Sequence, residues 1–591
     1  MTRDVSPQPF SSTATRKSHN VTMTEATEKP TYDETLLDKI TEGKASILFP
    51  KGNKVFYNPI QQFNRDISVL GIRAWSEIFE AEQKSKKAKK NNNNNKRKGS
   101  NKESESSPKF TKVSENEKVA AEAKPANESE AAEPATSETV EEKSADKQQE
   151  ESTAVGSNLV VAKPHEPKPY IEIIEALSAS GLRAIRYALE IPKIKTVIAN
   201  DFSASAVESI KQNSQYSGAD SVVKPNEGDA CVLMYQHKNK PVHVVDLDPY
   251  GSATPFMDAA VQSIKDGGIM LVTCTDLAVL AGNSYPEKCF SQYGGQTLHS
   301  DASHESALRL VLNMVASTAA KYGKSIEPLL SLSIDFYVRL FIRIKTSPLQ
   351  VKQNAHNTMI VYQCTGCGTF TKQPLGKAVQ KNNNFKYGYA RGPTVSERCA
   401  HCDSLHIIAG PMWGGPIHNK AFIDKMLEVY KDLDTDVYKT TSRIEGMLTL
   451  AKDELTDVPF YFSPQNIASI VRSSSPPHRK IVSALCNAGY QVSFTHALAG
   501  GIKTDAPFTV IWDIFRQWIK EAHNGETSKN LKEASPGTKI VKSLEPVSGL
   551  KISFEDHPRA LELEKFRKSK VVRYQENPTK NWGPKAKASK N

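Results

Sequence analysis

The chain has 591 residues, which is long enough for two or three domains with sizeable cores. Its 77 basic and 66 acidic residues give a net charge of +11, which permits a polyanionic partner without requiring one. Eight cysteines without a secretory signal favour reduced thiols or a metal site over a disulfide framework. Because no run of about 18 apolar residues occurs, we expect a soluble intracellular protein without a membrane span.

The first 44 residues are expected to be a targeting or disordered segment. Residues 1–22 are rich in Ser and Thr and contain one acid, Asp4, which is the composition of a mitochondrial presequence. Met23 offers a second start that would omit it; an ordinary disordered N-terminus is the alternative. The basic residues of this stretch are Arg3, Arg16, Lys17 and His19.

A catalytic domain is expected over residues 45–350, interrupted by a disordered insert at 82–166. The apolar spacing of Ile67–Phe79 is helical. Between that helix and Tyr170 the only aromatic residue is Phe110, so this segment cannot bury enough apolar surface to order itself.

The insert opens with a basic cluster over residues 84–98. Two Lys-rich runs, Lys84–Lys90 and Lys96–Lys98, are separated by five Asn. This layout resembles a bipartite nuclear import signal, and a solvated charge run is the alternative.

From residue 170 onward, strand patterns alternate with helical patterns of about ten residues. This alternation predicts an α/β fold with a parallel, doubly wound sheet. The expected strands are Ile171–Glu175, Lys195–Ala199, Val222–Val223, Val242–Val245, Gly268–Thr273 and two runs within Ile326–Ile344. The expected helices are Leu182–Leu189, Ala204–Ser214, Thr254–Ile264 and His304–Tyr322.

Small and acidic residues follow these strands where ligands bind in open α/β sheets. The turn after the first strand, residues 178–181, has one glycine, whereas a dinucleotide pyrophosphate requires a glycine-rich turn. This argues against an NAD-dependent oxidoreductase and favours S-adenosylmethionine as the cofactor. Asp201 could bind ribose hydroxyls and Asp229 an adenine amine; the alternative is that these acids only cap helices.

Asp248, Pro249 and Tyr250 follow the buried strand Val242–Val245. A carboxylate and a proline carbonyl beside an aromatic ring suit a planar base that carries an exocyclic amine. Asp248 and the Pro249 carbonyl could accept both N–H bonds of the amine, and Asp248 could receive the proton. A strand that simply ends in a Pro-Gly turn is the alternative.

A second domain is expected over residues 351–545. Cys364, Cys367, Cys399 and Cys402 form two Cys-x-x-Cys pairs with 31 residues between them, which predicts a structural zinc site with an extruded loop.

The pattern at the end of the second domain predicts a winged-helix-like structure that contacts RNA. A helix from Ser463, a helix over His478–Asn487 and a strand over Tyr490–Phe494 carry basic residues near their turn, and a basic solvated face is the alternative. These basic residues are Arg472, His478, Arg479 and Lys480. A basic tail, residues 546–591, adds Tyr574 and Trp582 as further candidate contacts to RNA.

The ordered motifs resemble those of the eukaryotic and archaeal tRNA (guanine-26) N2-dimethyltransferases. They are Phe56–Pro59, Asn64–Asp66, Ser178–Arg183, Asn200–Asp201, Gly228–Ala230, Asp248–Ser252, His304–Glu305 and Gly501–Pro507. The resemblance implies a class I S-adenosylmethionine-dependent methyltransferase with a Rossmann-like seven-stranded sheet and a C-terminal zinc-containing α+β domain. It also implies methylation of the N2 amine of guanine-26 in tRNA.

The same resemblance implies that five residues line the cofactor pocket: Arg65, Arg183, Asp201, Asp229 and Ala230. Either arginine could contact the methionine carboxylate. Asp-Pro-Pro-Tyr methyltransferases place their aromatic residue one position later than Tyr250, so its stacking role stays open.

Two other functions remain alternatives. Cys274 ends the fifth strand, where RNA cytosine-5 methyltransferases carry a nucleophile, although covalent attack suits a ring carbon and not an amine. A non-catalytic tRNA-binding or tRNA-folding protein is the other. We expect tRNA as partner, no obligate protein partner, and a nuclear and mitochondrial location.

Overall fold

The computed structural model describes residues 36–51, 57–99, 168–382, 384–527, 529–569 and 571–574, with side chains up to residue 89 in the second range. The described residues up to Phe79 and from Pro169 form one compact unit, and the end of the first long helix belongs to a second. Predictions for residues 1–35, for Phe56, for most of the insert and for Trp582 lie outside the described residues.

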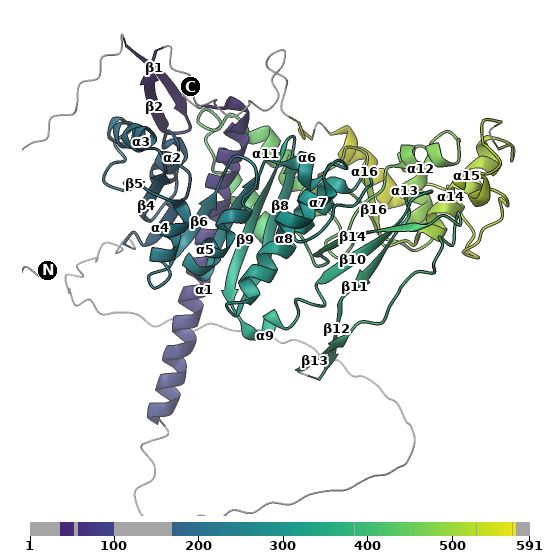
Figure 1. Ribbon diagram of the computed structural model, residues 1–591, viewed down its shortest axis with the longest axis horizontal. Coiled ribbons are helices and arrows are strands. Elements are labelled where there is room, and N and C mark those ends of the chain that lie inside the picture. Colours follow the sequence, from purple (N-terminus) through teal and green to yellow (C-terminus); the bar gives the residue numbers. More distant parts are fainter. Residues whose placement is uncertain are drawn as a thin grey trace, which may run out of the picture. The chain divides into compact units, whose positions relative to one another are not determined.

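A seven-stranded sheet in the order β5-β4-β3-β6-β7-β9-β8 is the centre of the fold (Figure 1). Its strands are β3 (Ile171–Glu175), β4 (Ile194–Asp201), β5 (Val223–Glu227), β6 (Val242–Leu247), β7 (Ile264–Cys274), β8 (Lys324–Ile334) and β9 (Tyr337–Thr346). Six strands are parallel and only β9 runs against them, because two residues connect β8 to β9 and so short a turn joins antiparallel strands. The predicted seven-stranded order is confirmed, and β9 makes the sheet mixed.

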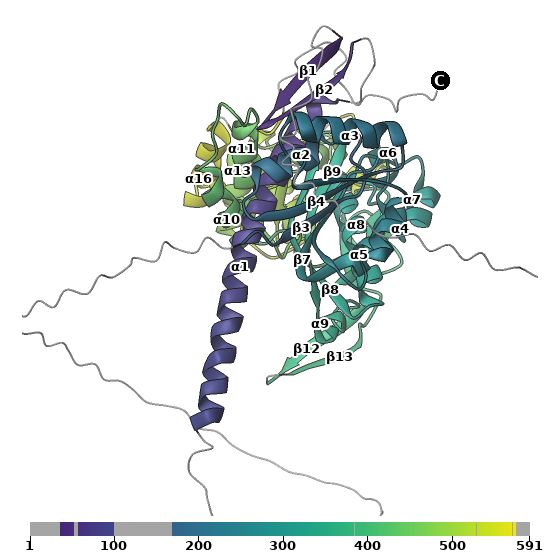
Figure 2. The ribbon, with the colours of Figure 1, turned by 90° about the vertical axis from the view of Figure 1, so that its left-hand side faces the viewer.

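Helices cover both faces of the sheet, and neighbouring residues of β6 show how. Val244 packs into the core formed with α1, α2, α10 and α11, whereas Val245 packs into the core formed with α4, α5 and α8, because successive strand residues point to opposite faces. These two layers flank the sheet in Figure 2. The helices are α1 (Gln62–Gly99), α2 (Leu182–Glu190), α3 (Ala204–Tyr216), α4 (Ala230–Gln236), α5 (Met257–Ser263), α8 (Ser303–Ala320), α10 (Lys420–Tyr430) and α11 (Thr441–Asp453).

Three predicted boundaries differ from the structure. β1 (Leu37–Glu42) lies in the segment 1–44 that we expected to be disordered, where antiparallel pairing with β2 (Ala45–Pro50) orders its largely polar sequence. α1 continues to Gly99, past the predicted start of the insert at residue 82. The boundary at 350 does not divide the packing either, because α10 and α11 belong to the sheet's core.

The C-terminal region contains a three-stranded antiparallel sheet, a separate hairpin and a helical part. The sheet is formed by β11 (Phe370–Pro374), β10 (Thr358–Cys364) and β14 (His406–Trp413), and the hairpin by β12 (Gly376–Lys381) and β13 (Asn384–Tyr389). The helical part comprises α12 (Pro464–Ile470), α13 (His478–Asn487), β15 (Val492–Phe494), β16 (Ile502–Thr504), α14 (Phe508–Ala522), α15 (Pro536–Ile540) and α16 (Pro558–Lys568). The predicted order of helix, helix and strand is therefore confirmed.

The expected basic tail from residue 546 begins as part of this fold. α16 contributes Ala560 and Leu563 to the apolar core of the helical part. Short helical segments complete the described chain: Pro59–Gln61, Thr254–Phe256, α6 (Leu277–Leu280), α7 (Pro286–Tyr293) and α9 (Pro348–Val351). No helix of the described ranges has a stretch long and apolar enough to cross a membrane.

Candidate active site and metal site

Asp248 lies directly after β6, at the carboxyl edge of the parallel strands. Its side chain is 22% exposed, Pro249 is buried, and Tyr250 is 51% exposed. Gly251 has φ +83°, a left-handed conformation that glycine adopts without strain. Its N–H donates to Thr275 Oγ1 at 2.8 Å, and its carbonyl accepts from Thr275 N at 2.9 Å, so the turn is held from both sides.

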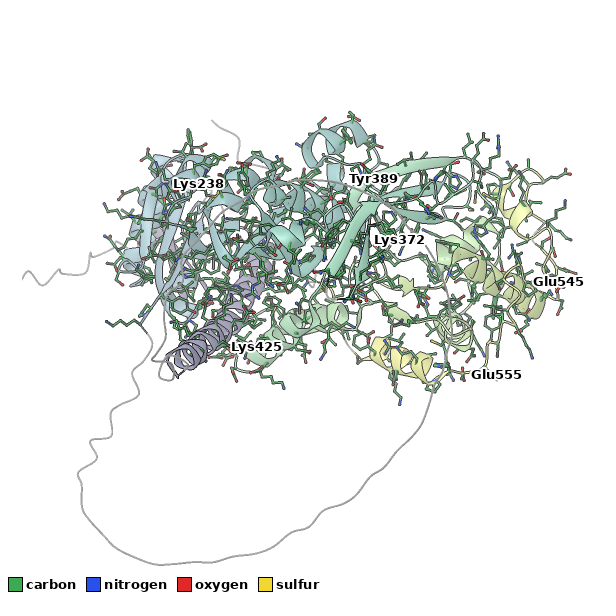
Figure 3. The ribbon with its side chains drawn as sticks, turned by 90° about the horizontal axis from the view of Figure 1, so that it is seen from below. Lys238, Lys372, Tyr389, Lys425, Glu545 and Glu555 are labelled. Atoms are coloured by element: carbon green, nitrogen blue, oxygen red, sulfur yellow. The ribbon has the colours of Figure 1, made fainter. Side chains whose placement is uncertain are left out.

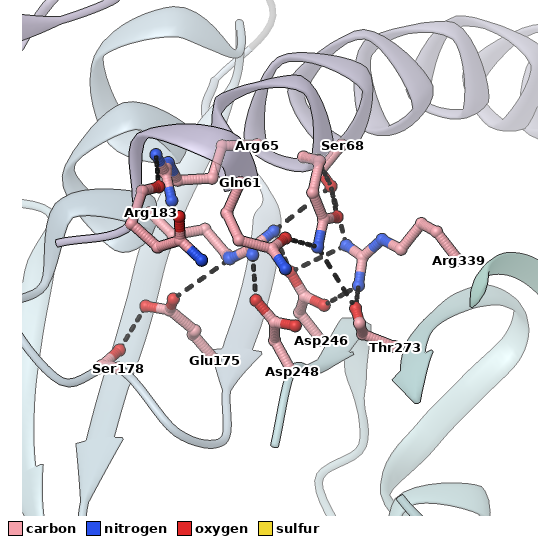
Figure 4. A network of polar contacts seen from close by, with 12 residues as sticks. Gln61, Arg65, Ser68, Glu175, Ser178, Arg183, Asp246, Asp248, Thr273 and Arg339 are labelled. Carbon is pink, nitrogen blue, oxygen red and sulfur yellow. Dashed lines mark hydrogen bonds and ion pairs between the residues drawn. The ribbon is translucent and has the colours of Figure 1, made fainter. Parts of the chain in front are cut away.

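A buried arginine holds Asp248 in place. Arg183, on α2, forms an ion pair with Asp248 and lies 3.5 Å from Asp246 and 3.6 Å from Glu175 (Figure 4). The side chain of Arg183 is 6% exposed. One carboxylate of this group therefore faces solvent, while its cationic partner is shielded from it.

Asp246 is the fully buried counterpart of Asp248, two residues earlier in the chain. Arg339 donates to its two oxygens at 2.8 and 3.1 Å, and the Tyr187 hydroxyl donates at 2.5 Å. Burial alone would raise the pKa of Asp246, but Arg339 and Arg183 hold this pKa below its usual range. Asp246 is thus a fixed anion inside the sheet.

Glu175, the last residue of β3, has the opposite protonation. Its burial raises its pKa to about 8, although Arg183 opposes the shift. The Ser178 hydroxyl contacts this carboxyl group. Glu175 is therefore mostly protonated at neutral pH, and the ion pairs with Asp246 and Asp248 balance the charge of Arg183.

Asp201 joins the end of β4 to the turn after β3. One of its carboxylate oxygens accepts from Ala179 N at 2.9 Å and the other from Ser203 N at 3.0 Å. The turn itself ends in Gly181, with φ +79°, where a Cβ would lie 3.2 Å from the Ile210 backbone. This close approach packs the turn against α3 and explains why position 181 is a glycine.

Asp229 and Ala230 begin α4. Asp229 is the N-cap of α4, and its Oδ1 accepts a hydrogen bond from Val232 N at 2.9 Å. One of its oxygens therefore caps the helix, as the alternative to adenine binding predicted. Ala230 is buried. Asp201, Asp229 and Asp248 therefore lie at or just after the carboxyl ends of β4, β5 and β6, which are on the same side of the sheet.

Phe202 is a candidate residue that our sequence analysis missed. It directly follows Asp201 and its side chain is 81% exposed. An exposed aromatic ring beside an acid at a ligand-binding edge suits a planar base. An aromatic residue after a strand-ending acid was the available signal.

Arg65 is engaged elsewhere. It donates to both Glu42 oxygens, at 2.6 and 2.5 Å, and to the Asn58 carbonyl at 3.1 Å. Its guanidinium lies 5.4 Å from the Tyr57 ring centroid. Arg65 therefore ties α1 to β1, and its contact with the cofactor stays a prediction.

Cys274 is fully buried, and burial raises the pKa of its thiol to about 12. A nucleophilic cysteine needs an accessible thiolate, so this environment argues against covalent chemistry at Cys274.

The four predicted metal ligands come together. Cys364, Cys367, Cys399 and Cys402 are buried, and their sulfur atoms all lie within 4.8 Å of one another. Two of the Sγ–Sγ distances are 3.3 and 3.6 Å, close to the roughly 3.8 Å that tetrahedral zinc–thiolate bonds of about 2.3 Å imply. Backbone N–H groups of Gly366, Cys367 and His401 point at Cys364 or Cys399 sulfurs from 3.4 Å, which suits thiolates. This set fits a structural zinc ion.

Comparisons with known proteins agree with this architecture. Residues 37–516 match the model of the family described as N2,N2-dimethylguanosine tRNA methyltransferase. The chain belongs to this family. A Saccharomyces cerevisiae relative named mitochondrial tRNA (guanine(26)-N(2))-dimethyltransferase is 48% identical over 93% of this chain and 92% of its own length. A Homo sapiens relative with the same enzyme name is 38% identical over 93% of this chain and 77% of its own.

A solved structure shares the fold. Trm1 from Pyrococcus horikoshii, described in complex with S-adenosyl-L-methionine, matches with a TM-score of 0.56 and 24% identity over 81% of this chain and 99% of that chain.

Two motifs that resemble the family meet inside the protein. Lys503 of β16 lies 3.0 Å from Glu305 of α8 and 3.0 Å from Glu454, and all three are buried. Arg309 and the Phe460 N–H also donate to Glu305. These ion pairs connect the sheet domain to the C-terminal part, which sequence alone did not reveal.

His418, Glu454 and His496 form a second cluster of potential metal ligands. Both histidines contact the same Glu454 oxygen, at 3.2 and 2.7 Å. Their other ring nitrogens accept backbone N–H bonds from Ser331 and Ser333, at 3.4 and 3.1 Å. Every ring nitrogen is therefore used within the protein, and the cluster serves as a hydrogen-bonded junction.

The basic residues of the winged-helix-like region also have intramolecular partners. Arg479 pairs with Asp556 and Glu564, and Lys480 donates to the Phe554 carbonyl at 2.9 Å. His478 Nε2 contacts the Gly500 carbonyl at 2.9 Å. The remaining member of the predicted set, Arg472, is exposed.

Proposed function

We propose that this chain transfers methyl groups from S-adenosylmethionine to the N2 amine of guanine-26 in tRNA, forming N2,N2-dimethylguanosine. The observation that carries the proposal is the partly exposed Asp248 at the carboxyl edge of β6, ion-paired to the buried Arg183 and followed by Pro249 and the exposed Tyr250. The names of the relatives support the same reaction.

Asp248 and Pro249 prepare the amine for reaction. The guanine amine is a poor nucleophile because its lone pair is delocalised into the ring. If Asp248 and the Pro249 carbonyl accept its two N–H bonds, the nitrogen can become pyramidal and direct its lone pair outward. Asp248 then stabilises the developing positive charge and receives the proton. Tyr250 offers an exposed ring on which the base can stack.

The second methylation makes a further demand on this site. Only one N–H remains on the amine, so the amine must turn to keep its bond to Asp248 while the first methyl group is accommodated. The Asp248 side chain is 22% exposed, and we assign the space for the methyl group to its solvent side.

S-adenosylmethionine supplies an electrophilic methyl group on a sulfonium when it is bound. We assign Asp201 to its ribose hydroxyls, Asp229 and Ala230 to its adenine, and Phe202 to the face of that ring. Arg183 and Arg65 are both assigned to the methionine carboxylate, and each already pairs with an acid of the protein, Arg183 with Asp248 and Arg65 with Glu42. A ligand carboxylate would share Arg183 with Asp248.

The four cysteines are assigned to zinc with a structural role. We expect stoichiometric zinc in the purified protein, and loss of zinc with a lower Tm in Cys364→Ser. Cys486→Ser, which changes a half-buried cysteine outside the cluster, is the matched control. Metal-free protein, or an unchanged Tm in Cys364→Ser, would contradict the assignment.

We further assign Arg472 and the basic tail after α16 to tRNA contacts, and propose both a mitochondrial and a nuclear location. The yeast relative is named mitochondrial. Fluorescent fusions that start at Met1 or Met23, each with or without the basic cluster 84–98, test the two signals separately. A distribution that ignores both changes would contradict the proposal.

Methyl transfer from labelled S-adenosylmethionine to tRNA tests the proposed reaction. Wild type should label a transcript with guanine at position 26 and not one with adenine there, and Asp248→Ala should lose at least about a thousandfold in rate. Equal incorporation by wild type and Asp248→Ala, at background level or above, would overturn it.

A further inference from the structure

The β12–β13 hairpin projects from the C-terminal sheet and carries no role in the site described above. Figure 1 shows it well away from β6, at whose end Asp248 lies. Its base is anchored: Leu375 N donates to the Thr358 carbonyl at 2.9 Å, and Gln373 Nε2 donates to the Arg391 carbonyl at 3.2 Å. The hairpin is therefore fixed at its base and projects from the C-terminal sheet.

Its two faces differ in chemistry. Three aromatic residues, Phe385, Tyr387 and Tyr389, alternate along β13 and share one face. They stand opposite Gln380, Ala378 and Gly376. Phe385 is exposed, whereas Tyr387 is half-buried and its hydroxyl is enclosed. Tyr389 is 95% exposed, and the rings of Phe385 and Tyr387 are stacked with centroids 6.4 Å apart.

The other face is basic. Lys377, Lys381 and Lys386 are exposed there, and no hydrogen bond or ion pair within the described ranges involves their ammonium groups. From Gly368 to Ser396 the sequence contains five Lys or Arg and no Asp or Glu. At the chain's average of 66 acids in 591 residues, a stretch of this length would hold about three. This surface complements a polyanion.

Exposed rings and unpaired lysines together favour RNA over an acidic protein. A two-stranded ribbon gains little stability from exposing Phe385 and Tyr389 beside the half-buried Tyr387, so these rings point to a contact with a partner. Unpaired bases stack on aromatic side chains and lysines neutralise the adjoining phosphates, whereas an acidic protein surface would use only the lysines. Arg479 and Lys480 of the winged-helix-like region, by contrast, already have partners within the chain.

We propose that the β12–β13 hairpin is an RNA-binding arm that contacts unpaired nucleotides of the substrate at a distance from Asp248. Phe385, Tyr387 and Tyr389 stack on bases, and Lys377, Lys381 and Lys386 contact phosphates. The identity of this RNA as tRNA rests on the proposed function. The arm contributes to substrate affinity and takes no part in the chemical step.

A hairpin without its rings tests the proposal. In the full chain, Phe385→Thr/Tyr387→Thr/Tyr389→Thr keeps residues that favour strands. We expect its Kd and KM for tRNA to rise on the order of tenfold, with kcat unchanged at saturating tRNA. Tm and zinc content should match those of wild type, which shows that the C-terminal sheet is intact.

A second variant tests the charges. Lys381→Gln/Lys386→Gln should weaken tRNA binding on the order of fivefold and lower the slope of log K against log salt by about 2. The matched control is Lys238→Gln/Lys240→Gln, which removes the same charge from two exposed positions after α4. Figure 3 shows Lys238 away from Tyr389 of the hairpin. The control should bind as wild type does.

Each outcome separates this inference from the proposed function. If both hairpin variants bind tRNA within about twofold of wild type while the wild type methylates it, the arm proposal fails alone and an acidic protein becomes the expected partner. If wild type does not methylate tRNA, the proposed function fails, and binding of an unstructured RNA to the same variants still tests the arm.

Discussion

Two of the buried charge networks in this protein differ in how they end. The first network lies at the carboxyl edge of the sheet, where Asp246 pairs with Arg339 and Arg183. Arg183 also pairs with Asp248, whose side chain reaches solvent. At the junction with the C-terminal part, Lys503 lies between two fully buried carboxylates.

The difference teaches what each network does. Where every member is enclosed and paired, as around Lys503, the charges can only hold parts of the chain together. Where a chain of buried pairs delivers one carboxylate to an accessible edge, as at Asp248, that group is held in place and still free to meet a ligand. Asp246 and Asp248, two residues apart, therefore have separate roles.

The contrast between the two aspartates should give the largest effects. Asp248→Asn should lower the rate of methyl transfer by about a thousandfold or more and change the unfolding free energy little, because the amide cannot take up the proton. Asp246→Asn leaves buried arginines without their carboxylate and should destabilise the protein by about 3–5 kcal/mol. Methyl-transfer rates and urea unfolding on the same samples measure both; similar profiles for the two variants would remove the distinction.

Lys503→Met tests the enclosed network. Loss of the cation leaves Glu305 and Glu454 facing each other in the interior, and we expect about 3–5 kcal/mol of destabilisation. Lys452→Met removes one partner of an exposed ion pair with Asp424 and should cost less than about 1 kcal/mol. If the two variants unfold alike, the junction does not depend on Lys503.

Glu175 should make stability depend on pH. Its folded-state pKa of about 8 lies above the ordinary value of 4.5, so its favourable contribution is complete below pH 4.5 and is lost as the pH rises toward 8. Glu175→Gln cannot release a proton. The unfolding free energy of this variant, relative to wild type, should therefore rise between pH 5 and pH 8; parallel curves over this range would place the ionisation elsewhere.

Cys274→Ala should have the smallest effect. The buried thiol plays no chemical part in our account, so we expect activity within about twofold of wild type and a modest loss of stability from the small cavity. Near-complete loss of methyl transfer in a folded variant would instead favour covalent chemistry at Cys274.

Strand-end chemistry was the predictable part of the site. Alternating strand and helix patterns located Asp201, Asp229 and Asp248, because parallel strands bring their carboxyl ends to one edge. The ion pair between Asp246 and Arg339 could not be predicted. The two residues are 93 positions apart, and only the place of β9 in the sheet brings Arg339 to Asp246. The sequence did not predict β1, because this strand is ordered by pairing with β2 and not by apolar residues of its own.

Surface roles were harder to predict than the fold. The basic residues near α13 formed the obvious candidate for an RNA contact, but a sequence does not show that Arg479 already pairs with Asp556. The loop between the cysteine pairs was expected to be extruded. Only the pairing of β12 with β13 shows that its aromatic residues lie on one face and its lysines on the other.

Nucleoside mass spectrometry of tRNA tests the central claim most directly. Cells that lack the endogenous enzyme would be complemented with wild type or Asp248→Asn, and position 26 of their tRNA would be analysed. We predict N2,N2-dimethylguanosine at position 26 with wild type and unmodified guanosine with Asp248→Asn at equal protein levels. Full dimethylation by Asp248→Asn would contradict the account.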